Sequence, residues 1–371
     1  VIFKNVIRPV DMRIFLKAFI ASGFSDTPYE TMSDGIAESY SIEIDRLKKI
    51  KEDEEVDTSA RKMIKKTYFN AVSYARGVIT KIGSGEKVNI KKAKRLVEAM
   101  VDRLLEEEQL LLSMTMIKDY DEYTYYHLVN VSIFSIALGQ RLGLSKKSLT
   151  ELGLTALFHD IGKMEIPHEV LNKPTSLTDD EWMLMKRHPV SGIRAILRLR
   201  GFDNTSIRSA IVAFEHHINC DFSGYPEVRK YTELDLYSKI VSIADHYDAM
   251  TSSRVYSRIP VSPDKAVSIM IERAGAQLDP LLLKFFINMV GIFPVGTLVM
   301  LDTKELGLVY ESNAVLVDRP RVLIIIDSNG RRVQGPVVNL AKKDETGRYL
   351  RSIVKTLDPN KYKINLAEYL L

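Results

Sequence analysis

The chain has 371 residues, of which 46% are apolar and 27% are charged, a balance typical of a globular protein with two or three domains. Its net charge of +4 is spread without a dominant basic block, which argues against a nucleic-acid polymer or a membrane surface as the main partner. A single cysteine, Cys220, excludes a disulfide framework and a thiolate metal site. We find no apolar segment of bilayer length and predict a cytoplasmic protein. Because the sequence opens with Val1 and not with methionine, we expect it to be part of a longer protein.

The residue pattern predicts a mainly α-helical protein that ends in a small β module. We expect a helical N-terminal region with a sensory or regulatory role over residues 1–88 and a connecting helix over 89–117. Amphipathic helices with short loops follow over 118–292 and predict an all-α domain. Strand-like segments with turns such as Ser328-Asn329-Gly330 occupy 293–371, and we expect the last residues to pack back on the helices.

The connecting helix carries an apolar stripe with a spacing of three to four residues. Its members are Ile90, Ala93, Val97, Met100, Leu104, Leu111 and Met114. The stripe fits two alternatives, a face buried in the protein's own core or the seam of a homodimer made by a parallel helix pair. The second alternative is the basis on which we predict a homodimer.

All seven histidines lie between positions 127 and 246. A single buried histidine is most often an ordinary core residue, but this set lies with carboxylates on helices and helix ends that can converge. The predicted ligands are His127, His159, Asp160, His188, His216, His217 and Asp245. Imidazoles and carboxylates without thiolates favour Fe, Mn, Ni, Co or Zn, and their number exceeds one tetrahedral site, so we predict two ions. His168 and His246 do not fit this pattern, and we expect them to be structural or surface residues.

Local signals place several of these residues. We expect His159 and Asp160 to end a helix that stops at Gly162. A capping box of Thr178 and Glu181 predicts the start of the helix that leads to His188. We expect Pro189 to break that helix beside the ring, and Asp245 and Asp248 to share one helix face.

Four segments, "HDIGK", "LNKPTSLTDDEWMLMKRHP", "EHHINCDFSGYP" and "ADHYDAMTSSRVYSR", together resemble the HD-GYP family, a branch of the HD phosphohydrolases, over about residues 110–290. The short β module also resembles segments that often follow such domains. The resemblance implies a phosphodiesterase that opens cyclic di-GMP to pGpG, and often on to GMP. It also implies iron, with manganese as the alternative. In the implied ligand sets, one ion is held by His127, His159, Asp160 and Asp245, and Asp160 bridges to a second ion held by His188, His216 and His217.

This assignment predicts a mechanism. Two such ions lower the pKa of a bridging water and supply hydroxide at neutral pH. We expect Lys163 and Arg254 to contact phosphate oxygens and Asp248 to steer or protonate near the metals. Tyr225 has three alternatives: its ring packs on a guanine, its hydroxyl binds phosphate, or it only anchors the loop.

Three departures from the family pattern bear on these predictions. Tyr123 stands where members with a third metal tend to carry glutamate, so we favour two ions over three. Phe222 replaces a glycine that often follows the loop aspartate, which is expected to change the loop backbone. Ser257 replaces a commonly basic residue, and Arg258, one position later, is the candidate substrate contact in its place.

Three functions remain in competition. The first is a cyclic di-GMP phosphodiesterase, and the second is an enzyme of the same class that prefers cyclic GMP-AMP. The third is a catalytically weak metal-containing signalling module that binds a cyclic dinucleotide or a GGDEF-type diguanylate cyclase. The presence of all predicted ligands favours an enzyme.

Overall fold

The computed structural model describes residues 2–3, 9–22, 25, 27–37, 39, 42–43, 52–83, 90–117, 122–200, 204–229, 232–252, 260–313, 315–333, 335–357, 362 and 364. The chain divides into two compact units, Val1–Ser59 and Ala60–Leu371. In the first unit, helices α1 (Pro9–Ser22) and α2 (Pro28–Gly35) pack through Ala18, Met32 and Ile36. Strand β1 (Ile2–Phe3) pairs antiparallel with β2 (Ile42–Glu43).

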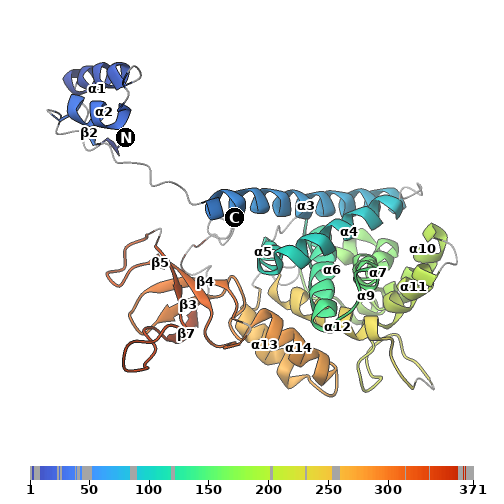
Figure 1. Ribbon diagram of the computed structural model, residues 1–371. Coiled ribbons are helices and arrows are strands. Elements are labelled where there is room, and N and C mark those ends of the chain that lie inside the picture. Colours follow the sequence, from blue (N-terminus) through green and yellow to red (C-terminus); the bar gives the residue numbers. More distant parts are fainter. Residues whose placement is uncertain are drawn as a thin grey trace. The chain divides into compact units, whose positions relative to one another are not determined.

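The second unit is built around helix α6 (Tyr123–Arg141), whose residues 126–139 are all buried (Figure 1). A helix that is enclosed on all sides belongs in the middle of a domain. Helices α7 (Lys146–Leu157), α12 (Leu236–Thr251) and α14 (Pro280–Val290) pack directly on it. The other helices are α3 (Glu52–Gly83), α4 (Ile90–Glu106), α5 (Glu108–Met114), η1 (Ile161–Glu165), α8 (His168–Leu171), α9 (Asp179–Met185), α10 (His188–Arg200), α11 (Asn204–Glu215) and α13 (Pro263–Glu272).

The apolar stripe on α4 and α5 faces the protein's own core. Six of its seven members are at most 2% exposed, namely Ala93, Val97, Met100, Leu104, Leu111 and Met114. They share one core with α3, which contributes Ile64 and Tyr68. The core alternative is therefore confirmed and the dimer seam is wrong, because a side chain buried within one chain is not available to a second. The predicted homodimer thus loses the apolar stripe as its basis. The predicted domain limits stay predictions.

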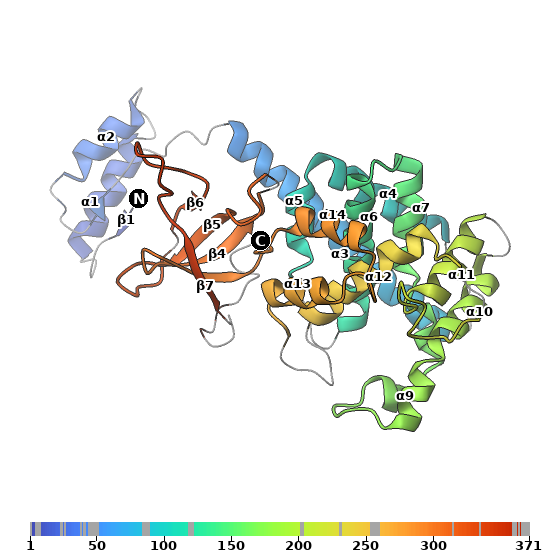
Figure 2. The same cartoon turned by 90° about the horizontal axis from the view of Figure 1, so that it is seen from below.

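The chain ends in a five-stranded antiparallel sheet with the strand order β6-β5-β4-β3-β7 (Figure 2). The strands are β3 (Leu298–Leu301), β4 (Leu306–Glu311), β5 (Arg321–Ile326), β6 (Val337–Asn339) and β7 (Ile353–Leu357). Alternate residues of one strand bury opposite faces: Val299 and Leu301 belong to one apolar cluster and Leu298 to another. The predicted turn is present, with Gly330 at φ +79°.

The mainly α-helical fold with a C-terminal β module is confirmed. The end of the chain lies largely outside the described residues, although Ile364 packs on the sheet. Among the described helices, none is both long enough and apolar enough to cross a membrane.

Candidate metal centre

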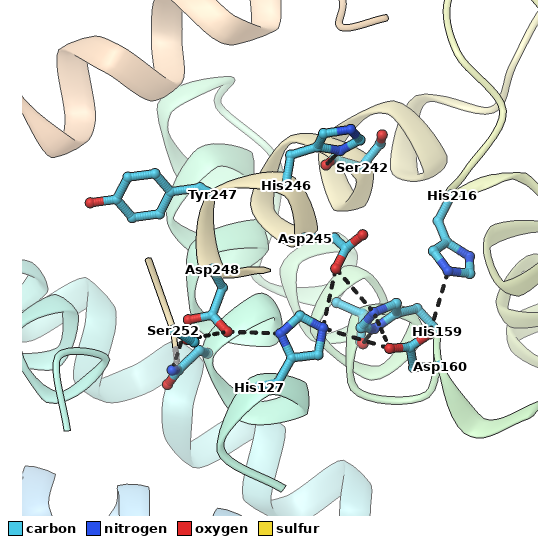
Figure 3. A network of polar contacts seen from close by, with 12 residues as sticks. His127, His159, Asp160, His216, Ser242, Asp245, His246, Tyr247, Asp248 and Ser252 are labelled. Carbon is cyan, nitrogen blue, oxygen red and sulfur yellow. Dashed lines mark hydrogen bonds and ion pairs between the residues drawn. The ribbon is translucent and has the colours of Figure 1, made fainter. Parts of the chain in front are cut away.

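Side chains from five elements of the helical domain converge on Asp160. Figure 3 shows four of these side chains around it, namely those of His127, His159, His216 and Asp245. The histidines and carboxylates come from positions that lie far apart in the sequence. His127 lies on α6 and Asp245 on α12, whereas the others stand at helix ends: His159 and Asp160 after α7, His188 at the start of α10, and His216 and His217 after α11. The sequence predicted this convergence, and the structure brings all seven residues together.

The two carboxylate oxygens of Asp160 face two different sets of imidazoles. Oδ2 lies 3.6 Å from Nε2 of His127 and 3.4 Å from Nε2 of His159. Oδ1 lies 3.3 Å from Nε2 of His188 and 3.6 Å from Nε2 of His216. Each set forms a group whose candidate ligand atoms lie within 4.8 Å of one another. Two further residues extend the groups: His217 belongs to the second, and Asp245 Oδ1 lies 3.1 Å from Nε2 of His127.

Four of the five candidate imidazoles are held so that Nε2 points inward. Nδ1 of His159, His188 and His216 donates to the carbonyl oxygen three residues earlier, at 2.7, 2.8 and 3.0 Å. Nδ1 of His127 donates to Oδ2 of Asp248 at 2.7 Å. Because the hydrogen is on Nδ1, the lone pair of Nε2 is directed into the centre, which is the arrangement of metal-binding histidines.

The polar atoms at the centre fit two cations. Nε2 of His127, Nε2 of His159 and Oδ1 of Asp160 are buried without a hydrogen bond from the described residues. The Nε2 atoms of His188 and His216 face each other at 3.3 Å. Buried acceptors that lack donors are costly, and lone pairs that face each other repel unless a positive charge lies close by. Nitrogen and oxygen donors of this kind suit a transition metal.

The electrostatics of the two groups differ. Burial lowers the pKa of His188 to about 3 and lowers the pKa of His217, so these rings are neutral, which is the form that can bind a metal ion. Burial also acts to lower the pKa of His127, but three surrounding carboxylates outweigh it and raise this pKa to about 10, so a metal ion held by this ring would displace the proton from Nε2. Burial acts to raise the pKa of Asp160, but the Lys163 ammonium and the nearby imidazoles keep it well below its usual range.

Two glycines allow the close backbone contacts that shape the centre. A Cβ atom on Gly162 would lie 1.9 Å from the carbonyl oxygen of His188, so only glycine lets η1 approach α10. The prediction that Gly162 stops the helix is wrong. Helix α7 ends at Leu157, and Gly162 lies inside η1. Gly224 has φ +94°, and a Cβ there would lie 2.3 Å from the carbonyl oxygen of His217.

The position of His188 corrects another prediction. The capping box of Thr178 and Glu181 is present and begins α9, but α9 ends at Met185. His188 is the first residue of α10, with Pro189 beside it in the first turn, where proline is tolerated. Pro189 thus begins a helix and does not break one.

Asp248 and Lys163 each contact one of the candidate ligands, His127 and Asp160 respectively. Asp248 is fully buried behind His127 and accepts from its Nδ1, so its place fits orientation of that ring and not contact with a substrate. Lys163 forms an ion pair with Oδ2 of Asp160, the carboxylate shared by both groups. The other two histidines lie outside both groups, as predicted: His168 is exposed, and His246 bonds to the carbonyl oxygen of Ser242.

An aromatic wall leads away from the centre. The ring of Tyr225 lies 4.6 Å from that of His217 and 6.0 Å from that of Trp182. Trp182, on α9, is 43% exposed. Our sequence reasoning missed Trp182, although it is the one tryptophan of the chain and stands inside a quoted motif.

The loop that carries Tyr225 also contains Phe222. Phe222 has φ +63°, in the left-handed region that favours glycine, so its replacement of a glycine puts a strained backbone there.

Tyr123 and the neighbouring Glu122 contact other residues and do not form a third group of candidate metal ligands among the described residues. The Tyr123 ring stacks on His127 at 5.3 Å, and Glu122 forms an ion pair with Arg76. In the part of the chain that the structure describes, the candidate groups number two. Arg254, Ser257 and Arg258 lie outside the described residues.

The helical domain is similar to known proteins. Residues 101–282 match the family model of the HD domain, and residues 298–365 match that of a KOW domain associated with the HD domain. A cyclic di-GMP phosphodiesterase of Pseudomonas aeruginosa is 36% identical over 71% of this chain and 63% of its own length. One of Thermotoga maritima is 31% identical over 54% of this chain and 55% of its own length. A 3'3'-cGAMP-specific phosphodiesterase of Vibrio cholerae is 31% identical, over 43% of this chain and 33% of its own length. The chain thus spans less than two thirds of each relative.

Proposed function

Since residues 101–282 form an HD domain, we propose that this chain is a metal-dependent phosphodiesterase that hydrolyses cyclic di-GMP to pGpG or GMP. The observation that carries the proposal is the shared carboxylate of Asp160, whose two oxygens face two sets of inward-directed imidazoles. The names of the relatives from Pseudomonas aeruginosa and Thermotoga maritima support cyclic di-GMP as the substrate.

The residues around the centre would hold two ions. Those that would hold the first are His127, His159, Asp160 and Asp245, and those that would hold the second are Asp160, His188, His216 and His217. The chemistry that such ions supply when bound is activation of water and neutralisation of phosphate charge. We propose iron as the metal and manganese as the alternative, because nitrogen and oxygen donors without thiolate suit both.

The chain's own groups position the substrate. The ammonium of Lys163 lies against Asp160 and is placed to neutralise charge on a phosphate that enters the centre. The aromatic wall of Tyr225 and Trp182 gives a purine base a face to stack on. Arg254 and Arg258 remain proposed phosphate contacts, and Asp248 is proposed to orient His127.

A second candidate substrate is cyclic GMP-AMP, because one relative is named as specific for it. Both dinucleotides present two purines and two phosphodiesters to the same centre. Four predictions from the sequence stay predictions: a catalytically weak signalling module, a GGDEF-type cyclase partner, a homodimer and a cytoplasmic location. Light scattering can test the homodimer.

The test is direct hydrolysis. Protein loaded anaerobically with Fe(II) or Mn(II) is incubated with cyclic di-GMP or cyclic GMP-AMP, and the products are separated by chromatography. We expect pGpG or GMP from cyclic di-GMP, at a rate that falls when the metals are removed by a chelator. Failure to cleave either dinucleotide with both candidate groups loaded would overturn the proposal.

A further inference from the structure

A continuous series of buried hydrogen bonds links helix α3 to His127. The hydroxyl of Tyr68, on α3, donates to Oδ1 of Asn130, on α6, at 2.8 Å. Nδ2 of Asn130 donates to Oδ1 of Asp248, on α12, at 3.0 Å. Oδ2 of Asp248 accepts from Nδ1 of His127 at 2.7 Å, the step visible in Figure 3. Tyr68, Asn130 and Asp248 are all 0% exposed, so water does not compete for these bonds.

The series meets at Asp248 from both ends. Its carboxylate accepts from the Asn130 amide on one side and from the His127 ring on the other, and it also accepts from the hydroxyl of Ser252 at 3.3 Å. The amide nitrogen of Asn130 also donates to the carbonyl oxygen of Thr115 at 3.2 Å, so the amide oxygen and both N–H groups of this side chain form hydrogen bonds. A reversed amide would turn its oxygen toward the Asp248 carboxylate and the Thr115 carbonyl oxygen, which are acceptors and have no hydrogen to share with it. The bonds therefore fix the Asp248 carboxylate, and the carboxylate fixes the His127 ring with Nε2 inward.

We propose that Tyr68 and Asn130 are positioning residues of the metal centre and couple the placement of α3 to the first metal ion. The inference rests on the proposed assignment of His127 as a ligand. Loss of the Tyr68 hydroxyl would leave Oδ1 of Asn130 buried without this donor, and an unpaired buried acceptor is costly. Any rotation of the amide that relieves this cost breaks its bond to Asp248 and releases the orientation of His127.

The series gives α3 a means of acting on the centre. The helix runs over Glu52–Gly83, and Tyr68 lies near its middle. A rotation or shift of α3 would move the Tyr68 hydroxyl away from Asn130, because a hydrogen bond weakens steeply with distance and angle. Arg76, two turns further along α3, pairs with Glu122 at the start of α6, so the same helix contacts α6 at two points.

The test is metal binding by Tyr68→Phe, which removes one oxygen atom. Metal-free protein is titrated with Co(II), and both the visible absorption of the bound ion and the number of ions per chain are measured. We expect the affinity for one of the two ions to fall roughly 10- to 100-fold, with a changed absorption band, because partners of ligating histidines commonly have effects of this size. The matched control is Tyr74→Phe, the same change on the same helix outside the series, which should bind both ions as the parent does.

The outcomes separate the claims. A Tyr68→Phe protein that binds both ions with the parent's affinity and spectrum overturns the inference, even if its melting temperature falls. A parent protein that binds fewer than two ions overturns the ligand assignment and, with it, the inference. Asn130→Ser gives an independent measurement. The shorter serine side chain lacks the amide that connects Tyr68 with Asp248, so this variant should also weaken binding of the same ion.

Discussion

His188 and His216 direct their Nε2 atoms at each other across 3.3 Å, while both Nδ1 atoms donate to backbone carbonyl groups. Two lone pairs at this distance repel unless a cation lies between or beside them. The same two nitrogens lie 3.3 and 3.6 Å from Oδ1 of Asp160. This relationship marks where the chain would hold the second proposed ion, apart from the first, which would lie on the side of Oδ2 of Asp160.

The first prediction follows from that separation. His188→Ala removes a nitrogen that serves the second group alone, so the metal content should fall from about two ions to about one per chain. The measurement is elemental analysis of protein purified in the presence of Fe(II) or Mn(II). His168→Ala, which replaces an exposed histidine outside both groups, is the control and should retain both ions. Equal metal content in the two variants would contradict the assignment.

The second prediction concerns Gly162. Its hypothetical Cβ lies 1.9 Å from a backbone oxygen of α10, which cannot move like a side chain. Gly162→Ala should therefore lower the free energy of unfolding by about 1–3 kcal/mol or more and disturb the second ion, because it displaces His188. Gly77→Ala is the matched control: nothing lies within 4 Å of its Cβ in an exposed part of α3, so alanine should stabilise by about 0.5–1 kcal/mol. Urea unfolding of both variants checks the sign of each change.

Six of the seven candidate metal ligands could be selected from the sequence because they stand inside the four quoted segments; the exception is His127. His216 and His217 are adjacent, and Asp160 follows His159, so no knowledge of the tertiary fold was needed to select them. The bridging role of Asp160 was likewise predicted and stays a prediction; its two oxygens face different imidazoles, His127 on one side and His188 on the other.

The contacts of Tyr68 and Asn130 could not be predicted in this way. They are 62 residues apart, and Asn130 is 118 residues from Asp248, so their bonds depend on how α3, α6 and α12 pack. The apolar stripe of α4 illustrates the same limit. Its period predicts a buried face, but whether the partner is the same chain or a second copy depends on the position of helices such as α7, which packs on α4.

The third prediction separates chemistry from metal binding through Lys163. Its ammonium contacts Asp160 without being able to act as a ligand. Lys163→Ala should keep both ions and the melting temperature but lose roughly 10²-fold or more in turnover of cyclic di-GMP, because charge that builds on the phosphate is no longer neutralised. Lys173→Ala, which removes a lysine paired with Glu181, is the control and should keep the parent rate. Turnover of Lys163→Ala at the parent rate would remove this residue from the mechanism.

The fourth prediction uses Trp182, the one tryptophan of the chain, which lies 43% exposed beside Tyr225. If a purine stacks on this wall, a phosphorothioate analogue of cyclic di-GMP that resists hydrolysis should quench the tryptophan fluorescence, whereas inorganic phosphate should not. Trp182→Ala should raise KM for cyclic di-GMP roughly 10-fold, since stacking of one base on an aromatic ring contributes about 1–3 kcal/mol. Inhibition by inorganic phosphate should stay unchanged, because phosphate has no base to stack. Met183→Ala, a change at a neighbouring side chain that is 57% exposed, is the control. An unchanged KM in Trp182→Ala, together with fluorescence that the analogue does not quench, would place the bases elsewhere on the protein and leave Trp182 as a surface residue of α9.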